Sequence, residues 1–342
     1  MKKIYAVLVT IILLTCSCYK QDVDKQNVNS NENNFTSTIN SNENKQENNN
    51  YVSYNGLLSV DGNNIVNQHN EKIVLRGISS HGIQWFNYLI TDENIKVLKS
   101  WNSNVFRLAM YTKEGGYIDD RKVYDDLIKG IDLIIKNDMY VIVDWHTLSD
   151  NNPNTYKKDA IEFFNNISTK YKDTPNIIYE ICNEPNGSTS WDDIKSYASD
   201  VISTIRKNSN NIIIVGTPTW SQDVDSVIGN KLDDKNIMYA LHFYSGTHKD
   251  DLRNKIKKAL DSDIPIFISE FGVSDASGNG GVYLDEANKW IDFIKSNNIS
   301  FVNWSLSDKN ESSALLKPNS KVINDDNLSE SGKYIKKLLT SY

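Results

Sequence analysis

The pattern of apolar and polar residues changes near position 50. Residues 19–50 are almost entirely Asn, Ser, Gln, Glu, Asp and Lys, a composition that offers too little apolar surface to stabilise a fold. From Tyr51 onward, short apolar runs alternate with amphipathic segments. Such runs are typical of buried strands, and apolar residues spaced three and four apart are typical of helices that cover them. We expect a disordered polar linker over 19–50 and a single folded domain over 51–342.

The apolar runs and amphipathic segments predict individual strands and helices. The predicted strands are Ile73–Gly82, Asn104–Tyr111, Tyr140–His146, Asn176–Glu184, Asn211–Thr217, Ile237–Tyr244, Pro265–Phe271 and Phe301–Leu306. The predicted helices include Val123–Asn137, Asp159–Tyr171, Trp191–Lys207, Asp250–Leu260, Leu284–Ser296 and a final one over Glu330–Tyr342. The segment Tyr51–Lys72 predicts a short hairpin.

Eight buried strands, mostly separated by helices, predict the α/β class and a (β/α)8 TIM barrel. The Tyr51–Lys72 hairpin would close the bottom of this barrel. The competing architecture is a doubly wound open sheet, but no Gly-rich phosphate loop follows the first predicted strand.

The N-terminus has the features of a secretory signal over residues 1–18. Two lysines follow Met1, and an apolar run extends from Ile4 to Leu14, too short to span a bilayer comfortably. The following Leu-Thr-Cys-Ser-Cys resembles a bacterial lipoprotein signal. That resemblance implies a lipid-modified cysteine, Cys18 first and Cys16 second, with ordinary secretion and a retained anchor as alternatives. We expect a secreted or extracellular protein, with anchoring to the outer face of the membrane left open.

Composition narrows the classes of partner. The formal net charge of −7 gives no basic face for nucleic acid, whereas seven Trp and eighteen Tyr suit a neutral polysaccharide. The one cysteine of the predicted domain, Cys182, lies within an apolar strand and is expected to be a small buried residue. No disulfide framework is therefore available there, and we expect a monomer without a cofactor.

Two glutamates close two buried strands. Glu184 ends the run Ile-Ile-Tyr-Glu-Ile-Cys-Asn-Glu before Pro185, and Glu270 ends the run Pro-Ile-Phe-Ile-Ser-Glu. Functional side chains of a barrel gather where its strands finish. Other strand ends carry further polar or aromatic residues that would be costly to bury for structure alone: Arg107, Tyr111, Asp144, His146, Asn183, His242, Tyr244 and Trp304.

Two neighbouring carboxyl groups can hydrolyse a glycosidic bond when one protonates the leaving oxygen and the other attacks the sugar. Arg107 would keep the attacking carboxylate ionised, and Tyr244 could donate a hydrogen bond to it. Structural interpretations compete: an ion pair for Arg107, core positions for His146 and His242, or a metal site, although a His-x-His pair is lacking. Asp144 and Glu180 are expected to be buried hydrogen-bond partners.

An ordered series of motifs resembles glycoside hydrolase family 5, most closely its bacterial endo-β-1,4-glucanases. The resemblance covers nearly the whole region from Tyr51 onward. The motifs are Arg76-Gly-Ile-Ser-Ser-His-Gly82 with Gln84-Trp-Phe86, Phe106-Arg-Leu108, Asp144-Trp-His146, Tyr179-Glu-Ile-Cys-Asn-Glu-Pro185, His242-Phe-Tyr244, Ser269-Glu-Phe-Gly272 and Asn303-Trp-Ser305.

The resemblance implies specific roles for these positions. Glu184 would be the proton donor and Glu270 the nucleophile, with Asn183 bound to the sugar 2-hydroxyl. The supporting residues around the two glutamates would be Arg107, His146, His242 and Tyr244. Substrate-binding positions would be His81, Trp85, Phe86, Tyr111 and Trp304, with Trp220, Ala276, Ser277, Lys309 and Glu311 as additions from the loops. Phe86 stands where relatives often have Tyr, which implies altered sugar affinity rather than lost catalysis.

The leading hypothesis is therefore a retaining endo-β-1,4-glucanase acting on cellulose or a related β-glucan. Within the same class, mannan, xyloglucan and mixed-linkage glucan are rival substrates. A surface lipoprotein that binds glycans without cutting them is the alternative from another class. No separate carbohydrate-binding module is expected, so soluble or amorphous chains are the expected preference.

Overall fold

The computed structural model describes residues 50–342. The predicted signal peptide, Cys16, Cys18 and residues 19–49 of the predicted linker lie outside the described residues. Within 50–342, no helix combines the length and the apolar character needed to cross a bilayer.

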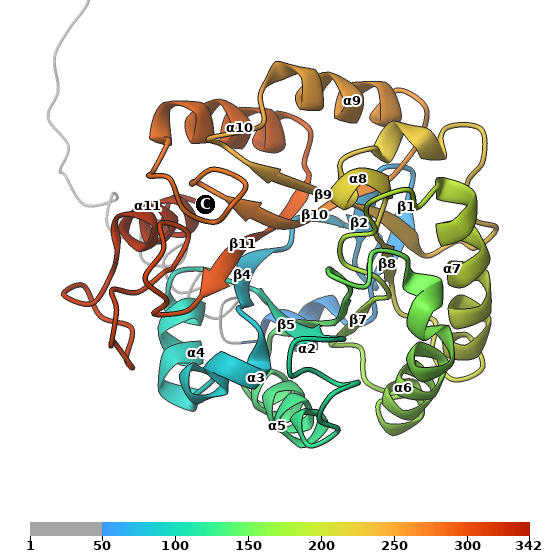
Figure 1. Ribbon diagram of the computed structural model, residues 1–342, viewed down its shortest axis with the longest axis horizontal. Helices are drawn as coiled ribbons and strands as arrows, with labels where there is room; N and C mark the ends of the chain where they lie inside the picture. Colours follow the sequence, from blue (N-terminus) through green and yellow to red (C-terminus); the bar gives the residue numbers. More distant parts are fainter. Residues whose placement is uncertain (1–49) are drawn as a thin grey trace, which may run out of the picture. The chain divides into compact units, whose positions relative to one another are not determined.

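Eight parallel strands close into a barrel in which each strand pairs with its two neighbours in chain order and the last pairs with the first (Figure 1). The strands are β4 (Arg76–Ser80), β5 (Val105–Tyr111), β6 (Tyr140–His146), β7 (Ile177–Glu180), β8 (Ile213–Val215), β9 (Ile237–Tyr244), β10 (Ile266–Gly272) and β11 (Ser300–Leu306). The (β/α)8 prediction is confirmed. The doubly wound alternative is wrong, because the barrel leaves no open edge.

The longer helices surround the barrel on its outside, and short helical turns lie on the loops that connect strands and helices (Figure 1). They are α3 (Ile83–Phe86), α4 (Asp92–Ser100), α5 (Val123–Lys136), α6 (Lys157–Lys170), α7 (Trp191–Ile205), α8 (Pro218–Ser221), α9 (Asp250–Leu260), α10 (Leu284–Ser296) and α11 (Glu330–Thr340), with 3-10 turns η1 (Asn87–Leu89), η2 (Pro153–Tyr156) and η3 (Val224–Val227). Helix α5 shows why they form: Leu127, Ile131 and Ile134 lie on its buried face, at the spacing of successive helical turns. Helices α3, α4 and α8 were not among the predicted helices.

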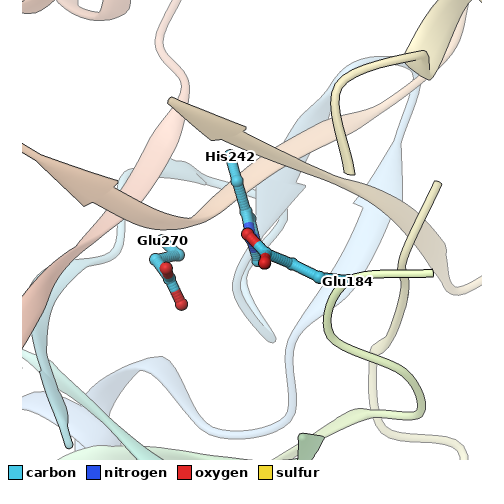
Figure 2. A group of neighbouring side chains, drawn as sticks. All are labelled: Glu184, His242 and Glu270. Carbon is cyan, nitrogen blue, oxygen red and sulfur yellow. The ribbon is translucent and has the colours of Figure 1, made fainter. Parts of the chain in front are cut away.

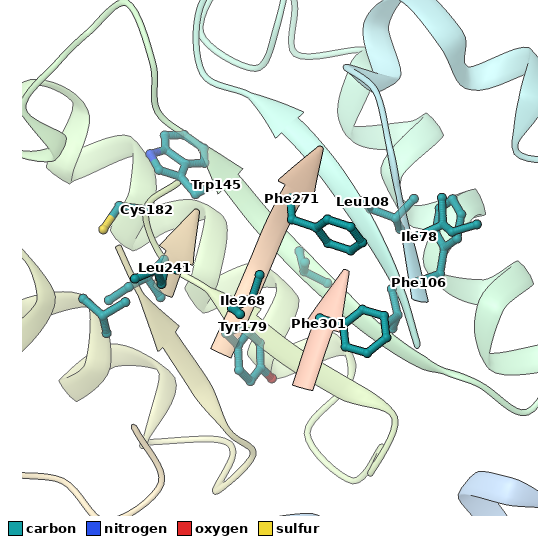
Figure 3. Close-up of a cluster of buried hydrophobic side chains, with 14 of the residues drawn as sticks. Ile78, Phe106, Leu108, Trp145, Tyr179, Cys182, Leu241, Ile268, Phe271 and Phe301 are labelled. Carbon is teal, nitrogen blue, oxygen red and sulfur yellow. The ribbon is translucent and has the colours of Figure 1, made fainter. Parts of the chain in front are cut away.

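Alternation along the strands divides the apolar side chains between two layers. On β5, Phe106 and Leu108 point outward into the layer between barrel and helices (Figure 3). Val105 belongs instead to a separate cluster at the floor of the barrel. Arg107 follows Val105 by two residues, is fully buried and lies on the same inner side, so the period of two brings a charge into the barrel interior.

The floor cluster joins the barrel to the segment before it. Val52, Leu58 and Ile65 pack in this cluster with residues of the barrel strands, which agrees with the predicted closure of the bottom. The predicted hairpin is only part of that segment. Its first residues form helix α2 (Tyr51–Asn55), and strands β1 (Ser59–Asp61), β2 (Asn64–Val66) and β3 (Lys72–Ile73) form a three-stranded antiparallel sheet. The first barrel strand consequently begins at Arg76 and not at Ile73.

Two further predicted strands are too long. The strand predicted over Asn176–Glu184 ends at Glu180, and that over Asn211–Thr217 is confined to Ile213–Val215. The two strands are neighbours, so the short β8 leaves β7 with little partner backbone on that side. Asn183 and Glu184 therefore lie on the segment that follows β7 rather than in the strand.

Candidate active site

Strand register brings the polar residues of several strands to one end of the barrel. Directly paired residues are Tyr111 with His146, Asp144 with Glu180, and His242 with Glu270. Paired residues on neighbouring strands point to the same face, so these side chains meet inside the barrel near the carboxyl ends of its strands. This is the end at which barrel proteins carry their functional groups.

Arg107 lies fully buried beneath this end and binds three carboxyl groups. Its Nε donates to Glu180 Oε2 at 2.7 Å and its Nη2 to Glu180 Oε1 at 3.3 Å. Nη1 donates to Glu270 Oε2 at 3.2 Å, and Nη2 lies 3.0 Å from Asp144 Oδ2. Although burial opposes the charged form, these carboxylates raise the pKa of Arg107. The planar set of five guanidinium donors explains how one side chain can orient so many acceptors.

Glu184 and Glu270 lie close together above Arg107. One oxygen of each carboxyl group and one ring nitrogen of His242 all lie within 4.8 Å of one another. Figure 2 shows the Glu184 carboxyl group against the His242 ring, with the Glu270 carboxyl group facing the same space. Both side chains keep some exposure, 13% for Glu184 and 6% for Glu270. The two carboxyl groups can therefore reach one bond of a molecule bound between them.

The carboxyl groups around His242 favour its protonated form. Burial acts to lower its pKa, but the Glu180 and Glu184 carboxylates raise it to about 9. Its Nδ1 lies 2.9 Å from Glu184 Oε1, and its Nε2 lies 3.0 Å from Ser269 Oγ. Both ring nitrogens thus have an oxygen partner.

Glu270 experiences opposing influences. Burial raises its pKa, and the neighbouring Glu184 acts in the same direction. His242, Arg107 and the Tyr244 hydroxyl favour the ionised carboxylate. Tyr244 Oη donates to Glu270 Oε1 at 2.7 Å, while Arg107 occupies the other carboxylate oxygen. The carboxylate is consequently fixed in orientation by both of its oxygens.

His146 is neutral because burial and the nearby Arg107 guanidinium lower its pKa. Its Nδ1 lies 2.6 Å from Asp144 Oδ2, and Nδ1 carries the proton because the amide N–H of Asn183 points at Nε2. Its Nε2 then accepts from Asn183 Nδ2 at 3.3 Å. Asn183 Oδ1 accepts from Arg107 at 2.6 Å, which fixes the orientation of the Asn183 amide.

Two hollows, of about 380 and 400 Å³, meet at the glutamates. Glu184, Trp220, Tyr244 and Ala276 line both of them, so they are two parts of one cleft. The first hollow also brings together most of the predicted binding residues: His81, Trp85, Tyr111, Ser277, Trp304, Lys309 and Glu311. Phe86 is not part of this lining; it packs against the His81 ring, with the ring centres 4.9 Å apart.

The first hollow ends at a charged pair. Lys309 Nζ lies 2.7 Å from Glu311 Oε2. Glu311 Oε1 also lies 3.9 Å from His81 Nε2. Burial, together with Lys309, lowers the pKa of His81 to about 3, so this last contact is made by a neutral ring and is not an ion pair.

Trp220 is presented by an unusual backbone. Thr219, Trp220 and Ser221 have φ angles of 58°, 55° and 56°, a left-handed conformation that costs about 1–2 kcal/mol for each residue with a Cβ. Two hydrogen bonds join this turn to the segment after β7: Trp220 N donates to Pro185 O at 2.9 Å, and Ser221 Oγ donates to Asn183 O at 2.6 Å. The turn is thus tied to the segment that carries Glu184.

Several residues of the cleft were not predicted from the sequence. They are Glu114, Leu148 and Gly278 in the first hollow and Thr219, Gln222, Thr247 and His248 in the second. His248 Nδ1 accepts from the Tyr244 backbone N–H at 2.8 Å, and burial lowers the pKa of this histidine. The available signal was the position of Thr247 and His248 shortly after the His-Phe-Tyr strand end, beyond Ser245 and Gly246. Cys182 is fully buried, as expected.

The three groups at the centre could be considered as metal ligands, because their atoms lie within 4.8 Å of one another. A histidine ligates a metal through an unprotonated nitrogen. At His242 both ring nitrogens already have oxygen partners within the protein, Glu184 Oε1 for Nδ1 and Ser269 Oγ for Nε2. The arrangement therefore favours proton transfer between protein and substrate over metal binding.

Comparison with known proteins places these features in a family context. The family model described as Cellulase (glycosyl hydrolase family 5) matches residues 66–310. An endoglucanase of Clostridium saccharobutylicum is 52% identical over 294 residues, 84% of this chain and 65% of the relative. Endoglucanase A of Evansella cellulosilytica is 53% identical over 252 residues, 72% of this chain and 52% of the relative. The chain thus spans between about half and two thirds of these relatives.

Solved structures agree with this relationship. The cellulase Cel5C_n is 47% identical with a TM-score of 0.82, over 84% of this chain and 93% of that one. The catalytic domain of Thermobifida fusca endoglucanase Cel5A, in complex with cellotetraose, is 34% identical with a TM-score of 0.81, over 84% of this chain and 98% of that one.

The contact between Tyr244 and Glu270 generates a testable prediction. Replacing Tyr244→Phe removes a hydrogen bond that stabilises the ionised carboxylate, so the pKa of Glu270 should rise. Carbon-13 NMR of labelled glutamate carboxyl groups, titrated with pH, measures this change. In the control Tyr334→Phe, which removes a hydroxyl bound to Asn288 on the surface, Glu270 should titrate as in the unmodified protein. An unchanged or lowered pKa in Tyr244→Phe would contradict the assigned contact.

Proposed function

The chain belongs to glycosyl hydrolase family 5, and from this premise we propose that it is a retaining endo-β-1,4-glucanase that hydrolyses cellulose or a related β-glucan. The observation that carries the proposal is the position of Glu184 and Glu270, whose oxygens approach within 4.8 Å in a cleft that continues beyond them into two hollows. Both reacting groups belong to the protein, so the proposed reaction uses no cofactor.

In the first step, Glu270 attacks the anomeric carbon while Glu184 gives a proton to the leaving oxygen, forming a covalent glycosyl-enzyme. Arg107 and Tyr244 hold the two oxygens of Glu270 and thereby orient its attack. Asn183 is proposed to bind the sugar 2-hydroxyl. Its amide is already fixed by Arg107 and His146, so little ordering is needed when substrate binds.

In the second step, Glu184 accepts a proton from water, which attacks the same carbon and releases the sugar. The two inversions together retain the anomeric configuration. His242 contacts Glu184 directly. Its protonation can therefore change together with the charge on Glu184.

Cleavage inside a chain requires sugar-binding surfaces on both sides of the reacting bond. The first hollow offers Trp85, Tyr111 and Trp304, whose ring faces suit the apolar faces of sugars. Trp220, which is 44% exposed, lines both hollows and extends this surface into the second one. The solved relative bound to cellotetraose supports a β-1,4-glucan as the substrate, with mannan, xyloglucan and mixed-linkage glucan as the rival substrates.

The direct test is the replacement Glu270→Gln, which preserves shape but removes the nucleophile. Release of reducing ends from carboxymethyl-cellulose should fall by at least about 10³-fold, equivalent to roughly 4 kcal/mol of activation free energy. Glu93→Gln, on the outer helix α4, is the control and should retain activity. Full activity in Glu270→Gln would refute the assignment of Glu270 as the nucleophile. If the protein only binds glycans, the unmodified chain should show no hydrolysis either. The same assay across mannan, xyloglucan and lichenan distinguishes the rival substrates.

The distance between the carboxyl oxygens predicts the stereochemistry of the product. Retaining glycosidases have their carboxyl groups about 5–5.5 Å apart, whereas inverting ones need about 6.5–9.5 Å to admit water. The first product formed from a cello-oligosaccharide should therefore be the β-anomer, observed by proton NMR before mutarotation. Initial appearance of the α-anomer would exclude Glu270 as a nucleophile.

We also propose that the enzyme is secreted and tethered through a lipid on Cys18, with Cys16 as the alternative, because the N-terminal residues resemble a lipoprotein signal. Cells expressing the full chain should incorporate a fatty-acid probe into the protein. Cys18→Ser should abolish the label and Cys16→Ser should leave it. Loss of the label only in Cys16→Ser would show that the lipid is attached to Cys16. A protein that is secreted without any label would show secretion without a lipid anchor.

A further inference from the structure

Ser269 and Glu180 form a chain of hydrogen bonds behind His242, on the side away from Glu184. Ser269 Oγ donates to Glu180 Oε1 at 2.7 Å, and His242 Nε2 lies 3.0 Å from the same Oγ. Ser269 and Glu180 are fully buried, and neither has a role in the reaction proposed above. The arrangement nevertheless determines where the protons on His242 can be.

The donor directions follow from elementary hydrogen-bond chemistry. An ionised carboxylate can only accept, so the single proton of the Ser269 hydroxyl points to Glu180. Although burial opposes ionisation, Arg107 and His242 lower the pKa of Glu180 to about 2, so it is ionised. Ser269 Oγ must then accept from His242, which requires a proton on Nε2.

A proton on Nε2 leaves Nδ1 facing Glu184 Oε1 at 2.9 Å. Only two states then exist for the proton between these atoms. Either Glu184 carries it and donates to a neutral His242, or His242 carries it and donates to a Glu184 carboxylate. The first state suits the acid step of the reaction and the second suits the base step, in which Glu184 must accept a proton.

We propose that Glu180, acting through Ser269, sets how this proton is divided between Glu184 and His242, and that Glu180 and Ser269 are positioning residues of the acid/base. The negative charge of Glu180 stabilises the imidazolium, and Ser269 transmits that stabilisation to Nε2. Glu180 is itself fixed by its two hydrogen bonds from Arg107. The catalytic meaning of this inference rests on the proposed function. The hydrogen-bond chemistry from which it is argued does not.

Other charged and titratable groups also act on this ring, and the test must separate them from Glu180. Besides Glu180 and Glu184, they are Glu270 on β10, Asp144 and His146 on β6, and His248 after β9. None of these contacts Ser269 through a hydrogen bond among the described residues. Glu180 Oε1 itself lies 3.8 Å from His242 Nε2, so replacing Ser269 removes the hydrogen-bond acceptor at Nε2 and leaves the charge of Glu180 and of the other groups in place.

The test is the pH dependence of kcat/KM for a cello-oligosaccharide in Ser269→Ala. Ser269→Ala removes the hydrogen-bond acceptor of His242 Nε2 and so destabilises the imidazolium form of His242. The last proton shared by His242 and Glu184 should therefore dissociate at lower pH. The basic limb should move down by about one pH unit, the shift equivalent to one hydrogen bond to a charged group. Glu180→Gln, which keeps the shape and removes the charge, should move it in the same direction. Ser103→Ala, a buried serine at the far end of β5 bonded to Val105 O, should not move it.

A second substrate distinguishes this role from a structural one. Dinitrophenyl cellobioside has a leaving group that needs no proton, so its basic limb should stay where it is in Ser269→Ala and Glu180→Gln. A general loss of rate on both substrates without a shift would overturn the proposal.

Nitrogen-15 NMR of the His242 ring tests the chemistry without turnover. The unmodified protein should show two protonated nitrogens at pH 7, consistent with a pKa of about 9, and Ser269→Ala should lose the Nδ1 proton at lower pH. An unshifted titration in both folded variants would refute the inference. Absence of hydrolysis by the unmodified protein would instead refute the proposed function, leaving this titration to decide the inference alone.

Discussion

The burial of one guanidinium among carboxylates is the constraint on which this structure depends. Moving an isolated charge out of water costs several kcal/mol, so Arg107 is tolerable only with its partners in place. Those partners come from three other strands: Asp144 from β6, Glu180 from β7 and Glu270 from β10. A slip of one residue in any strand would turn its side chain to the other face. Correct folding of the barrel and correct placement of the proposed nucleophile are therefore the same requirement.

The site divides its tasks between strands and loops. Strand residues hold the charges in a fully buried layer, where positions are set by backbone pairing. The turn around Trp220 and the loop with Ala276 surround the cleft above that layer. This loop is attached at both ends: Ala276 N donates to Thr247 Oγ1 at 2.9 Å, and Ser313 N donates to Gly278 O at 2.9 Å. The binding surface can therefore vary in side chains while the charged layer beneath it stays unchanged.

This division also explains what could be predicted from the sequence. Alternating apolar runs identified all eight barrel strands, and the glutamates were found because each closes such a run. The end of β7 was placed too late, because Ile181 and Cys182 continue the apolar pattern after the regular pairing has stopped. Helix α2 was missed since its five residues are too few for a helical period to be visible. Gln222 and His248 lie in loops, where no periodicity marks a side chain as facing a cleft.

The depth of the charged layer has a consequence for the medium in which the protein works. Dissolved ions weaken attractions between exposed charges over about 8–10 Å in dilute salt solution, and much less so those between buried groups. Mobile ions cannot approach Arg107, Asp144 or Glu180, because these side chains are inaccessible to solvent. The attractions between Arg107 and its buried carboxylate partners are therefore nearly independent of salt concentration. Concentrated salt would act mainly on the outer surface of the molecule.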